Sequence, residues 1–545
     1  MPKRSTISFL GILFLVSCLW FSSCSLGSST PTTGIAPTVG ATVVSTADNS
    51  VSGEITGKIL GPLFVNPDNP RYFTNGVKVN NKYRSVYLTG AHTWCNFMDC
   101  GNTRQPVPFD YNAFLDFLQA NNLNFFRLWR AENARGGEAG PDFWFDPMPY
   151  QRSDECCAFD GGNKFDLEKF NQAYFDRMRE RVIEAGNRDI YVSIMLFDGW
   201  SVESKFGGHN PWAGHPYKLE NNINNINGDV NGNGQGEDTH ILTNTPVTTL
   251  QEAYVKKVID TVNDLDNVLY EISNESPGDN PATSEMDGSK DWQYHLIHFV
   301  KEYESTKPKE HPVGMTWEWL NGNNQYLYES PADWISLGGN VNIDTYEPPV
   351  SDGKSNSKII VADTDHLCGL CGTIQWVWKS FTRGENPLYM DAYDAAFTGR
   401  GAPADYDPNN AKDVSLLLNL GYTRRYANRM NLTAMAPRPN MCSTGYCLVS
   451  SLADDTEYLV FLPSGATVAN ILSHWDINKN PLIRLPADSK VDVDLTGSPM
   501  ELSVEWFNPA NGDIILSTAV QGGASRSFTA PFSGDAVLYI YDASP

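Results

Sequence analysis

Between residues 85 and 390 the chain alternates short apolar runs with stretches in which apolar residues recur at helical spacing. Runs of this length predict buried strands, and the spaced stretches predict amphipathic helices. The expected strands are 85–91, 123–129, 189–197, 267–273, 312–317, 334–337, 358–362 and 387–390, and the expected helices include 111–120, 165–185, 250–265 and 292–303. Strands that alternate with helices indicate parallel βα units.

The number of units favours one architecture within the α/β class. Eight strands with helices between many of them predict a closed (β/α)8 barrel, the TIM barrel. A doubly wound open sheet is the alternative, but it would carry a glycine-rich phosphate loop after its first strand. Here Gly90 is followed by His92 and Trp94, which cannot cradle a pyrophosphate.

The pattern changes after about residue 437. Strand-length runs now follow one another with turns between them and without helical spacing, at 457–462, 491–495, 502–507, 513–516, 525–528 and 536–541. Such a run of short strands predicts a small all-β sandwich. We therefore expect a barrel domain over residues 56–437 and a sandwich domain over residues 438–545.

The amino-terminal residues have the features of an export signal. Lys3 and Arg4 precede an apolar run at residues 7–16, which is too short to cross a bilayer as an ordinary transmembrane helix. We interpret residues 1–24 as a signal peptide. Residues 25–55 are rich in Ser, Thr, Gly and Pro and are expected to form a flexible tether.

Two cysteines in the signal region each end a stretch that resembles the lipobox of bacterial lipoproteins, in which the cysteine is lipidated. They are Cys18 and Cys24, and the residues around them do not choose between the two. A plain secretory signal is the alternative. The chain is expected to be exported, either secreted or held at the bacterial cell envelope, and to touch the membrane only through a lipid anchor.

The charge of the chain excludes some partners. The formal net charge is −24 at pH 7, and an acidic surface repels nucleic acid and anionic membranes. Uncharged carbohydrates are not excluded, and an aromatic content of 12% suits the stacking of sugar rings as well as the filling of a large core.

Eight cysteines lie beyond the signal region, in closely spaced pairs. Export implies an oxidising compartment, in which such pairs form disulfides. Cys442 with Cys447 is the disulfide that we expect. Cys368 and Cys371 have the CxxC spacing of redox and zinc sites, but no second CxxC or nearby pair of histidines completes a zinc site, so a disulfide is favoured.

One stretch resembles the opening of a calcium-binding loop. Asp229, Asn231, Asn233 and Glu237 place oxygen ligands at alternate positions, with glycines at the turn. His240 stands where an EF-hand has its bidentate Glu, so a Gly- and Asn-rich surface loop is the favoured interpretation and calcium the alternative. No other cofactor is expected.

The ends of the predicted strands carry the candidate chemistry, because a (β/α)8 barrel draws its reactive side chains from the carboxyl ends of its strands. The third strand ends at Asp198, the fourth at Asn274 and Glu275, and the seventh at Asp363. Cleavage of a glycosidic bond needs one carboxyl group as an acid and a second as a nucleophile or base. Carboxyl groups at separate strand ends therefore fit a hydrolase of O-glycosidic bonds in an oligo- or polysaccharide, the function that the following resemblance implies.

The pair Asn274–Glu275 resembles the strand-four signature of clan A glycoside hydrolases. This resemblance implies that Glu275 is the acid/base and that Asn274 binds the sugar 2-hydroxyl. It also implies a nucleophile at the end of strand seven, usually Glu, where this chain has the shorter Asp363. Asp363 is therefore expected as nucleophile or base, which leaves a retaining or an inverting outcome open. Asp365 and Glu318 are the substitutes.

Helix capping is the structural alternative for both positions, 274–275 and 363. Arg127 matches the barrel arginine of the clan, which braces the nucleophile. The other candidates for substrate binding lie at strand ends, where their convergence counts for more than each residue alone: His92, Trp94, Trp129, Trp317, Asp365 and His366.

A wider resemblance covers most of the mature chain. Residues 92–99, 363–366 and 376–384 are similar to a group of exported bacterial cellulase-like hydrolases, and residues 504–509 and 532–538 to the β-domain that follows the barrel in many of them. That β-domain carries a collagen-binding label, which implies no collagen binding here. The resemblance implies a domain that packs on the barrel.

Two other functions are alternatives to the hydrolase. The first is a cell-surface glycan-binding lipoprotein on a barrel that has lost catalysis, for which Asp363 in place of Glu is the support. The second is a metalloprotease, which would need an H-E-x-x-H motif that the sequence lacks.

Overall fold

The computed structural model describes residues 58–137, 140–205, 209–242, 244–279, 288–339, 343, 358–391, 393, 411–450, 456–465 and 489–542. The expected signal peptide, the lipidated Cys18 or Cys24 and the tether lie outside these residues. No helix within the described ranges is long and apolar enough to cross a membrane.

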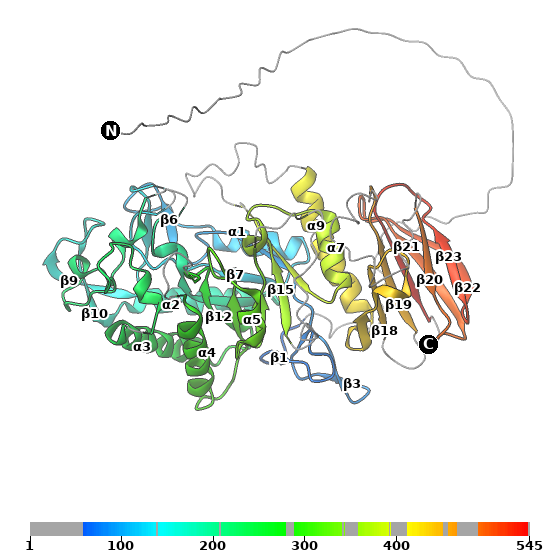
Figure 1. The fold of residues 1–545 in the computed structure, drawn as a ribbon, viewed down its shortest axis with the longest axis horizontal. Coiled ribbons are helices and arrows are strands. Elements are labelled where there is room, and N and C mark those ends of the chain that lie inside the picture. The colour runs from blue at the N-terminus through cyan, green and yellow to red at the C-terminus, as the bar shows by residue number, and fades with distance from the viewer. Residues whose placement is uncertain are drawn as a thin grey trace, which may run out of the picture. The chain divides into compact units, whose positions relative to one another are not determined.

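Eight parallel strands close into a barrel, which confirms the predicted fold (Figure 1). In chain order they are β5 (Gly90–His92), β7 (Phe125–Leu128), β11 (Tyr191–Asp198), β12 (Val268–Asn274), β13 (Val313–Thr316), β14 (Trp334–Ser336), β15 (Ile359–Asp363) and β16 (Asn386–Met390). Each strand pairs with the next, and β16 pairs with β5 to close the ring. The fourth strand therefore ends at Asn274 and the seventh at Asp363, as the sequence predicted.

Helices follow most of the barrel strands. They are α1 (Tyr111–Ala120), α2 (Gln172–Gly186), α3 (Thr245–Val262), α4 (Lys290–Glu304), α5 (Asn324–Glu329), α6 (Thr364–Leu367), α7 (Ile374–Thr382) and α9 (Ala411–Arg429). Figure 1 shows α3 and α4 side by side, and both of them contact neighbouring helices or strands of the barrel wall. Helix α1 begins where Asp110 accepts a hydrogen bond from Ala113 N at 3.0 Å.

The helix expected over residues 165–185 is wrong in its first part. Residues 163–170 form strand β10 (Asn163–Phe170), which pairs antiparallel with β9 (Tyr150–Cys156), and the helix begins only at Gln172. Phe165, Asp166 and Leu167 are all buried, so the burial of the side chains follows the contacts of β10 and not a simple alternation. The helical and the strand pattern overlap in so short a run, and the pairing with β9 favours the strand.

Short hairpins precede and flank the barrel, at β1 (Phe64–Val65), β2 (Phe73–Thr74), β3 (Lys78–Val79), β4 (Lys82–Tyr83), β6 (Asp99–Gly101) and β8 (Trp144–Asp146). Leu63 and Phe73 pack into one apolar cluster with side chains of the barrel strands, among them Phe125, Leu269 and Ile359. These three lie at or near the beginnings of their strands, so the amino-terminal hairpins cover that end of the barrel.

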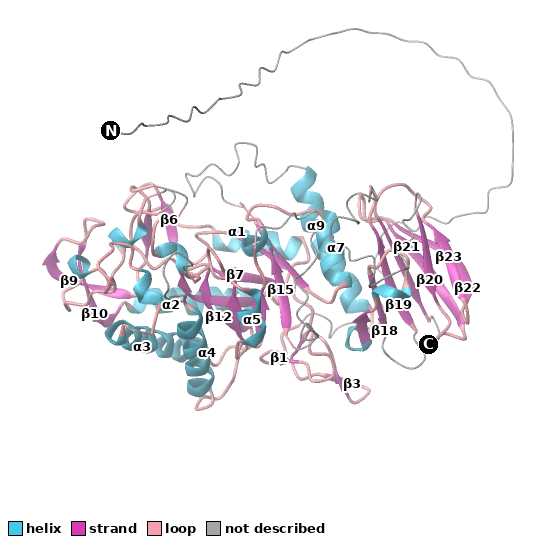
Figure 2. Cartoon of the chain, in the orientation of Figure 1, coloured by secondary structure: helices cyan, strands magenta, loops and turns pink. Residues whose placement is uncertain are grey.

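The C-terminal part is built from antiparallel strands (Figure 2). Six of them form one sheet in the order β17 (Met435–Pro437), β18 (Cys447–Ser450), β19 (Glu457–Leu462), β24 (Ala536–Tyr541), β21 (Glu501–Phe507) and β22 (Ile514–Gln521), and β20 (Lys490–Asp494) pairs with β23 (Ser525–Thr529). This confirms the predicted all-β domain, whose first strand begins at Met435, just before the expected boundary.

The six-stranded sheet takes part in two apolar cores. One face packs on α7 and α9, where the ring centroid of Phe507 lies 5.6 Å from those of both Trp378 and Tyr426. The Tyr426 hydroxyl also donates to Glu505 Oε1 at 2.6 Å. The other core contains Val491 and Val493 of β20. The sheet is thus held between the barrel helices and the β20–β23 pair.

The cysteines beyond the signal region form four local disulfides, Cys95–Cys100, Cys156–Cys157, Cys368–Cys371 and Cys442–Cys447. The predicted Cys442–Cys447 pairing is confirmed. The CxxC pair is a disulfide, as favoured.

Phe507→Ala tests the packing of the sheet on the barrel. Phe507 is fully buried against Trp378 and Tyr426, so we expect its truncation to lower the free energy of unfolding by about 3–5 kcal/mol. Leu516→Ala on β22 is the control, since Leu516 is 53% exposed and should change that free energy by no more than about 0.5 kcal/mol. Urea denaturation measures both, and equal effects of the two variants would contradict the interface.

Candidate active site

A cavity of about 800 Å³ lies at the carboxyl ends of the barrel strands. Three carboxyl side chains line it, Asp198, Glu275 and Asp365. Its aromatic lining includes two phenylalanines and five tryptophans, Phe143, Phe145, Trp94, Trp129, Trp200, Trp317 and Trp319. Acidic groups surrounded by indole rings in a cavity of this size can hold a sugar and act on it chemically.

Glu275 directly follows β12 and has a backbone φ of +41°, in the left-handed region that non-glycine residues rarely adopt. The residue is 3% exposed, and the indole Nε1 of Trp200 donates a hydrogen bond to its Oε2. Burial raises the pKa of Glu275 well above its usual value, and the nearby Asp365 raises it further. The group therefore keeps its proton at higher pH than an ordinary glutamic acid.

Asp363 ends β15 and is fully buried, and it does not line the cavity. Its Oδ1 lies 3.0 Å from His92 Nε2 and accepts from Asp365 N at 3.0 Å, and Oδ2 accepts from Arg127 Nη1 at 3.2 Å. Burial alone would raise the pKa of Asp363, but His92 and Arg127 outweigh it and hold the pKa well below its usual value. The backbone contact is the N-cap of α6, so the capping alternative describes what this side chain does.

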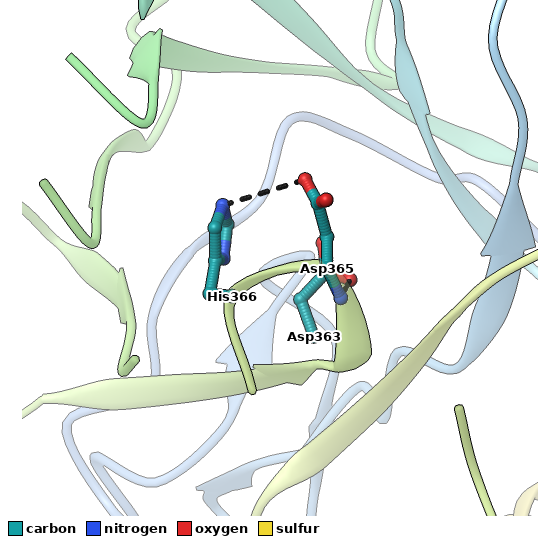
Figure 3. A group of neighbouring side chains, drawn as sticks. All are labelled: Asp363, Asp365 and His366. Carbon is teal, nitrogen blue, oxygen red and sulfur yellow. Dashed lines mark hydrogen bonds and ion pairs between the residues drawn. The ribbon is translucent and has the colours of Figure 1, made fainter. Parts of the chain in front are cut away.

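Asp365 lies two residues after Asp363, in the first turn of α6, and does line the cavity. Figure 3 shows it beside Asp363 and His366 at the end of β15. Its Oδ2 accepts from Arg127 Nη1 at 2.8 Å. Burial raises the pKa of Asp365, and the guanidinium opposes that rise. Asp365 is therefore the strand-seven carboxyl group that faces the cavity.

Arg127 on β7 connects these groups to the fourth strand. Its Nε and Nη2 donate to the two oxygens of Glu271 at 2.8 and 2.5 Å, and Nη2 also donates to Asn274 Oδ1 at 2.6 Å. The guanidinium is buried together with Glu271. Two parallel bonds to one carboxylate fix the plane of the guanidinium and aim its remaining nitrogen at the strand-seven aspartates.

Asn274 is fully buried and its amide is engaged by the protein. Its Oδ1 accepts from Arg127 and lies 3.2 Å from His366 Nε2, and its Nδ2 donates to Asp198 Oδ1 at 3.3 Å. Burial lowers the pKa of His366 to about 3, so the ring is neutral near pH 7. Ser336 Oγ lies 2.7 Å from its Nδ1, which leaves Nε2–H to donate to Asn274. The role of Asn274 as a sugar ligand stays a prediction.

Asp363, Asp365 and His366 offer ligand atoms that all lie within 4.8 Å of one another, a spacing that a metal ion could use. However, Arg127 Nη1 contacts both aspartates, at 3.2 and 2.8 Å. The guanidinium already supplies the positive charge that these carboxylates need, so we assign no metal to them.

The loop with the calcium-like motif leads into a short 3-10 helix at Glu237–His240. Asp229 Oδ2 accepts from Gly234 N at 2.9 Å, and Asn231 Nδ2 donates to Glu237 Oε1 at 3.1 Å. Asn233 Nδ2 also donates to Glu237. The four residues therefore come together as the motif implied, and calcium binding there stays a prediction.

The structure sorts the residues predicted from the sequence into two groups. Those that line the cavity are Trp94, Trp129, Glu275, Trp317, Asp365 and His366, and those buried beneath it are His92, Arg127, Asn274 and Asp363. Glu318 belongs to neither group, since it accepts from Ser289 Oγ at 2.8 Å and does not line the cavity. Burial raises the pKa of Glu318 to about 7.

Sequence reasoning missed Trp200, Trp319 and Glu271. Glu271 had a signal, because it is a charged residue within an otherwise apolar strand. The two tryptophans had none, because nothing in the sequence distinguishes an indole that lines a cavity from one that fills a core.

Three comparisons with known proteins bear on this site. A search of curated proteins with the sequence finds no match. A family model described as a domain of unknown function (DUF6298) matches residues 130–317, which include Glu275 and less than half of the chain.

Solved structures share the fold. The chain is similar to a protein described as a glycoside hydrolase, with 12% identity, a TM-score of 0.51, and coverage of 89% of this chain and 98% of that one. It is also similar to a family 5 glycoside hydrolase from Bacteroides vulgatus ATCC 8482, with 13% identity, a TM-score of 0.51, and coverage of 89% of this chain and 94% of that one. At such identities the likeness establishes the fold alone.

Asp363→Asn tests the buried network. The substitution removes the negative charge that Arg127 contacts at 3.2 Å and His92 at 3.0 Å. We therefore expect the free energy of unfolding to fall by about 3–5 kcal/mol at pH 7. Because the folded-state pKa of Asp363 lies below its unfolded value, this stability is present above about pH 4 and is lost as the pH falls further. Denaturant titrations at several pH values measure the difference from the unsubstituted chain.

Asp264→Asn is the matched control for that variant. Asp264 is 63% exposed and pairs with Arg179 at 2.6 Å, and a surface pair of this kind contributes less than about 1 kcal/mol. If both substitutions cost the same, or if the difference at Asp363 persisted at acid pH, the network would not have the assigned role.

Proposed function

We propose that this protein hydrolyses O-glycosidic bonds in an oligo- or polysaccharide, with Glu275 as the acid and Asp365 as the nucleophile or base. The observation that carries the proposal is the pair itself. Glu275 and Asp365 follow the fourth and seventh barrel strands and line one cavity. Burial raises the pKa of both groups, and that of Glu275 rises well above its usual value, while Asp365 accepts a hydrogen bond from the Arg127 guanidinium and Glu275 accepts one from the Trp200 indole.

In this proposal Glu275 is the member of the pair that carries the catalytic proton. Glu275 is buried and Asp365 partly buried, and the charge of Asp365 raises the pKa of Glu275, so the two groups are expected to titrate as a pair. Arg127 Nη1 lies 2.8 Å from Asp365 Oδ2 and stabilises its negative charge. Glu275 accepts its hydrogen bond from a neutral indole instead. One proton shared between the two groups therefore resides on Glu275 over the working range of pH.

In the proposed reaction Glu275 gives its proton to the leaving oxygen as the glycosidic bond breaks. Asp365 either attacks the anomeric carbon or takes a proton from the water that attacks it. In the first case water then cleaves the sugar–Asp365 bond, and Glu275 takes the proton of that water, which restores both groups. The first route retains the anomeric configuration and the second inverts it.

Asp363 has a supporting part in this proposal. It holds Arg127 and His92 and starts α6, the turn that carries Asp365. The resemblance implied that Asp363 is the nucleophile or base. We propose Asp365 for that role instead, because it was the substitute in the sequence and it lines the cavity.

The walls of the cavity suit carbohydrate. Trp129 and Trp317, with the three other lining tryptophans, present flat apolar faces on which a sugar ring can stack. The two solved structures of the same fold are described as glycoside hydrolases, which agrees with the proposal. A barrel that only binds glycan would not need a protonated Glu275 beside an ionised Asp365.

Glu275→Gln and Asp365→Asn test the catalytic pair. Each substitution keeps the shape of the side chain and removes its proton chemistry, so we expect kcat to fall by about 10²- to 10⁴-fold. The assay is the release of reducing ends from neutral polysaccharides such as β-glucan, β-mannan and xylan. The anomeric form of the first product, followed by proton NMR, distinguishes retention from inversion.

Glu318→Gln is the control for these variants, because Glu318 is a buried carboxyl group outside the cavity. We expect it to keep most of the activity. Activity that survives in the Glu275 and Asp365 variants, or that vanishes only in the Glu318 variant, would contradict the proposal. Binding without cleavage in the unsubstituted chain would favour the glycan-binding alternative.

The charge of the cavity predicts which polysaccharides are cleaved. Asp198, Glu275 and Asp365 line it, and the described lining residues include no Lys or Arg. A carboxylate or sulfate on the sugar would find no Lys or Arg among these lining residues to pair with and would lose its hydration without compensation, so we expect kcat/KM at least about 100-fold higher for neutral polysaccharides than for polygalacturonate. Cleavage of both at equal rates would contradict this expectation.

A further inference from the structure

We propose that Trp200 is a positioning residue for the acid: it determines which oxygen of Glu275 carries the catalytic proton. This inference rests on the proposed function of Glu275. It adds a residue that lies far from Glu275 in the sequence.

The direction of one hydrogen bond carries the argument. The indole Nε1–H of Trp200 points at Glu275 Oε2, and an indole nitrogen can only donate. Oε2 must therefore accept, and it cannot present a proton toward Trp200. The acid proton then resides on Oε1, and the carboxyl group has a single orientation for proton transfer instead of two.

The backbone brings Trp200 to this place. Strands β11 and β12 are parallel neighbours, and Asp198 pairs with Asn274 in their register. The chain then turns through a 3-10 helix at Gly199–Ser201. Asp198 caps this turn, since its carboxyl oxygens accept from Trp200 N at 3.2 Å and from Ser201 Oγ at 3.0 Å.

Gly199 permits the close approach of the turn to Glu275. A Cβ atom at position 199 would lie 2.0 Å from the carbonyl oxygen of Glu275 and 2.6 Å from the Cα of Ser276. Both contacts are with backbone, so no side chain could move aside. The turn that carries Trp200 therefore lies directly against the backbone of the acid.

The buried side chain of Glu132 connects the turn that carries Trp200 to the segment that carries Glu275. Glu132 Oε1 accepts from Asp198 N at 2.9 Å and lies 3.0 Å from His240 Nε2, and His240 Nδ1 lies 3.0 Å from Ser276 Oγ. These contacts link the residue before the turn to the residue after Glu275. The donor and the acceptor of the Trp200–Glu275 bond are thus held by one rigid support.

The same bond acts during proton transfer. When Oε1 gives its proton to the leaving oxygen, Glu275 becomes a carboxylate, and the indole N–H then donates to a charged acceptor, which is the stronger kind of hydrogen bond. Trp200 therefore favours the product state of that step. It also lowers the pKa of Glu275 against the effects of burial and Asp365.

Other charged groups also act on Glu275 and are unchanged when Trp200 is replaced. They are Asp365 after β15, Arg127 on β7 and Lys205 beyond the turn. Asp198 lines the same cavity, and burial raises its pKa to about 7. A change that follows replacement of the Trp200 indole alone therefore reports the hydrogen bond.

The test compares the pH profiles of kcat/KM for Trp200→Phe and Trp319→Phe. Trp319 lines the same cavity, with its ring centroid 5.1 Å from that of Trp200, so both variants lose a similar area of indole. Loss of the donor should move the basic limb of the profile up by about one pH unit in the Trp200 variant. It should also lower kcat several-fold, up to about 10-fold, because the carboxylate that forms on proton transfer loses the indole donor. The limb should stay in place in the Trp319 variant.

The substrate is the neutral polysaccharide that the unsubstituted chain cleaves fastest. A basic limb that stays in place in Trp200→Phe would overturn the inference while Glu275→Gln still abolished cleavage. Retained cleavage in Glu275→Gln would instead overturn the proposed function. If Trp200→Phe does not fold, 5-fluorotryptophan in place of tryptophan makes the same N–H a stronger donor, and the limb should move to lower pH. No movement would again count against the role of Trp200.

Discussion

Arg127 meets three carboxylates in the interior of the barrel, from Glu271 on the fourth strand and from Asp363 and Asp365 at the end of the seventh. Charges cannot be buried there singly, because each would lose its hydration without compensation. The guanidinium contacts all three, and its planar fork sets the directions of these contacts. The strand ends next to Glu275 and at Asp365 are therefore joined through one side chain.

The sequence revealed the fold because barrel strands are buried on both faces and read as apolar runs that can be counted. That count, together with the adjacent Asn274 and the resemblance to clan A glycoside hydrolases, led to Glu275, because reactive groups follow the strands. At the end of the seventh strand it favoured Asp363 and left Asp365 as a substitute. The choice depends on a side chain turning back to cap α6, and residues so close to each other share every pattern that a sequence displays.

An overlap between the strand and the helical pattern explains why residues 165–170 were predicted as part of a helix. Phe165 and Leu167 fit a strand, yet the run continues into a helix whose spacing includes them. Only the partner strand β9 distinguishes the two. Trp200 is a related case, because its partner Glu275 comes from a different strand and the contact depends on the register of β11 against β12.

The C-terminal sheet covers the side of α7 that the barrel strands leave uncovered. Residues 376–382 of this helix are all buried, and a helix that is buried all round needs a partner on each side. The barrel strands provide one, and the β-sheet, through Phe461 and Phe507, provides the other. The all-β domain thereby completes the packing of the segment that follows the turn bearing Asp365.

Two of the disulfides border the cavity, since Cys95, Cys100 and Cys368 are among the residues that line it. Both close short loops that border the cavity, whereas the described barrel strands beneath, and the ionic network that they carry, contain no cysteine. The shape of this border therefore depends on thiol oxidation, and the ionic network does not.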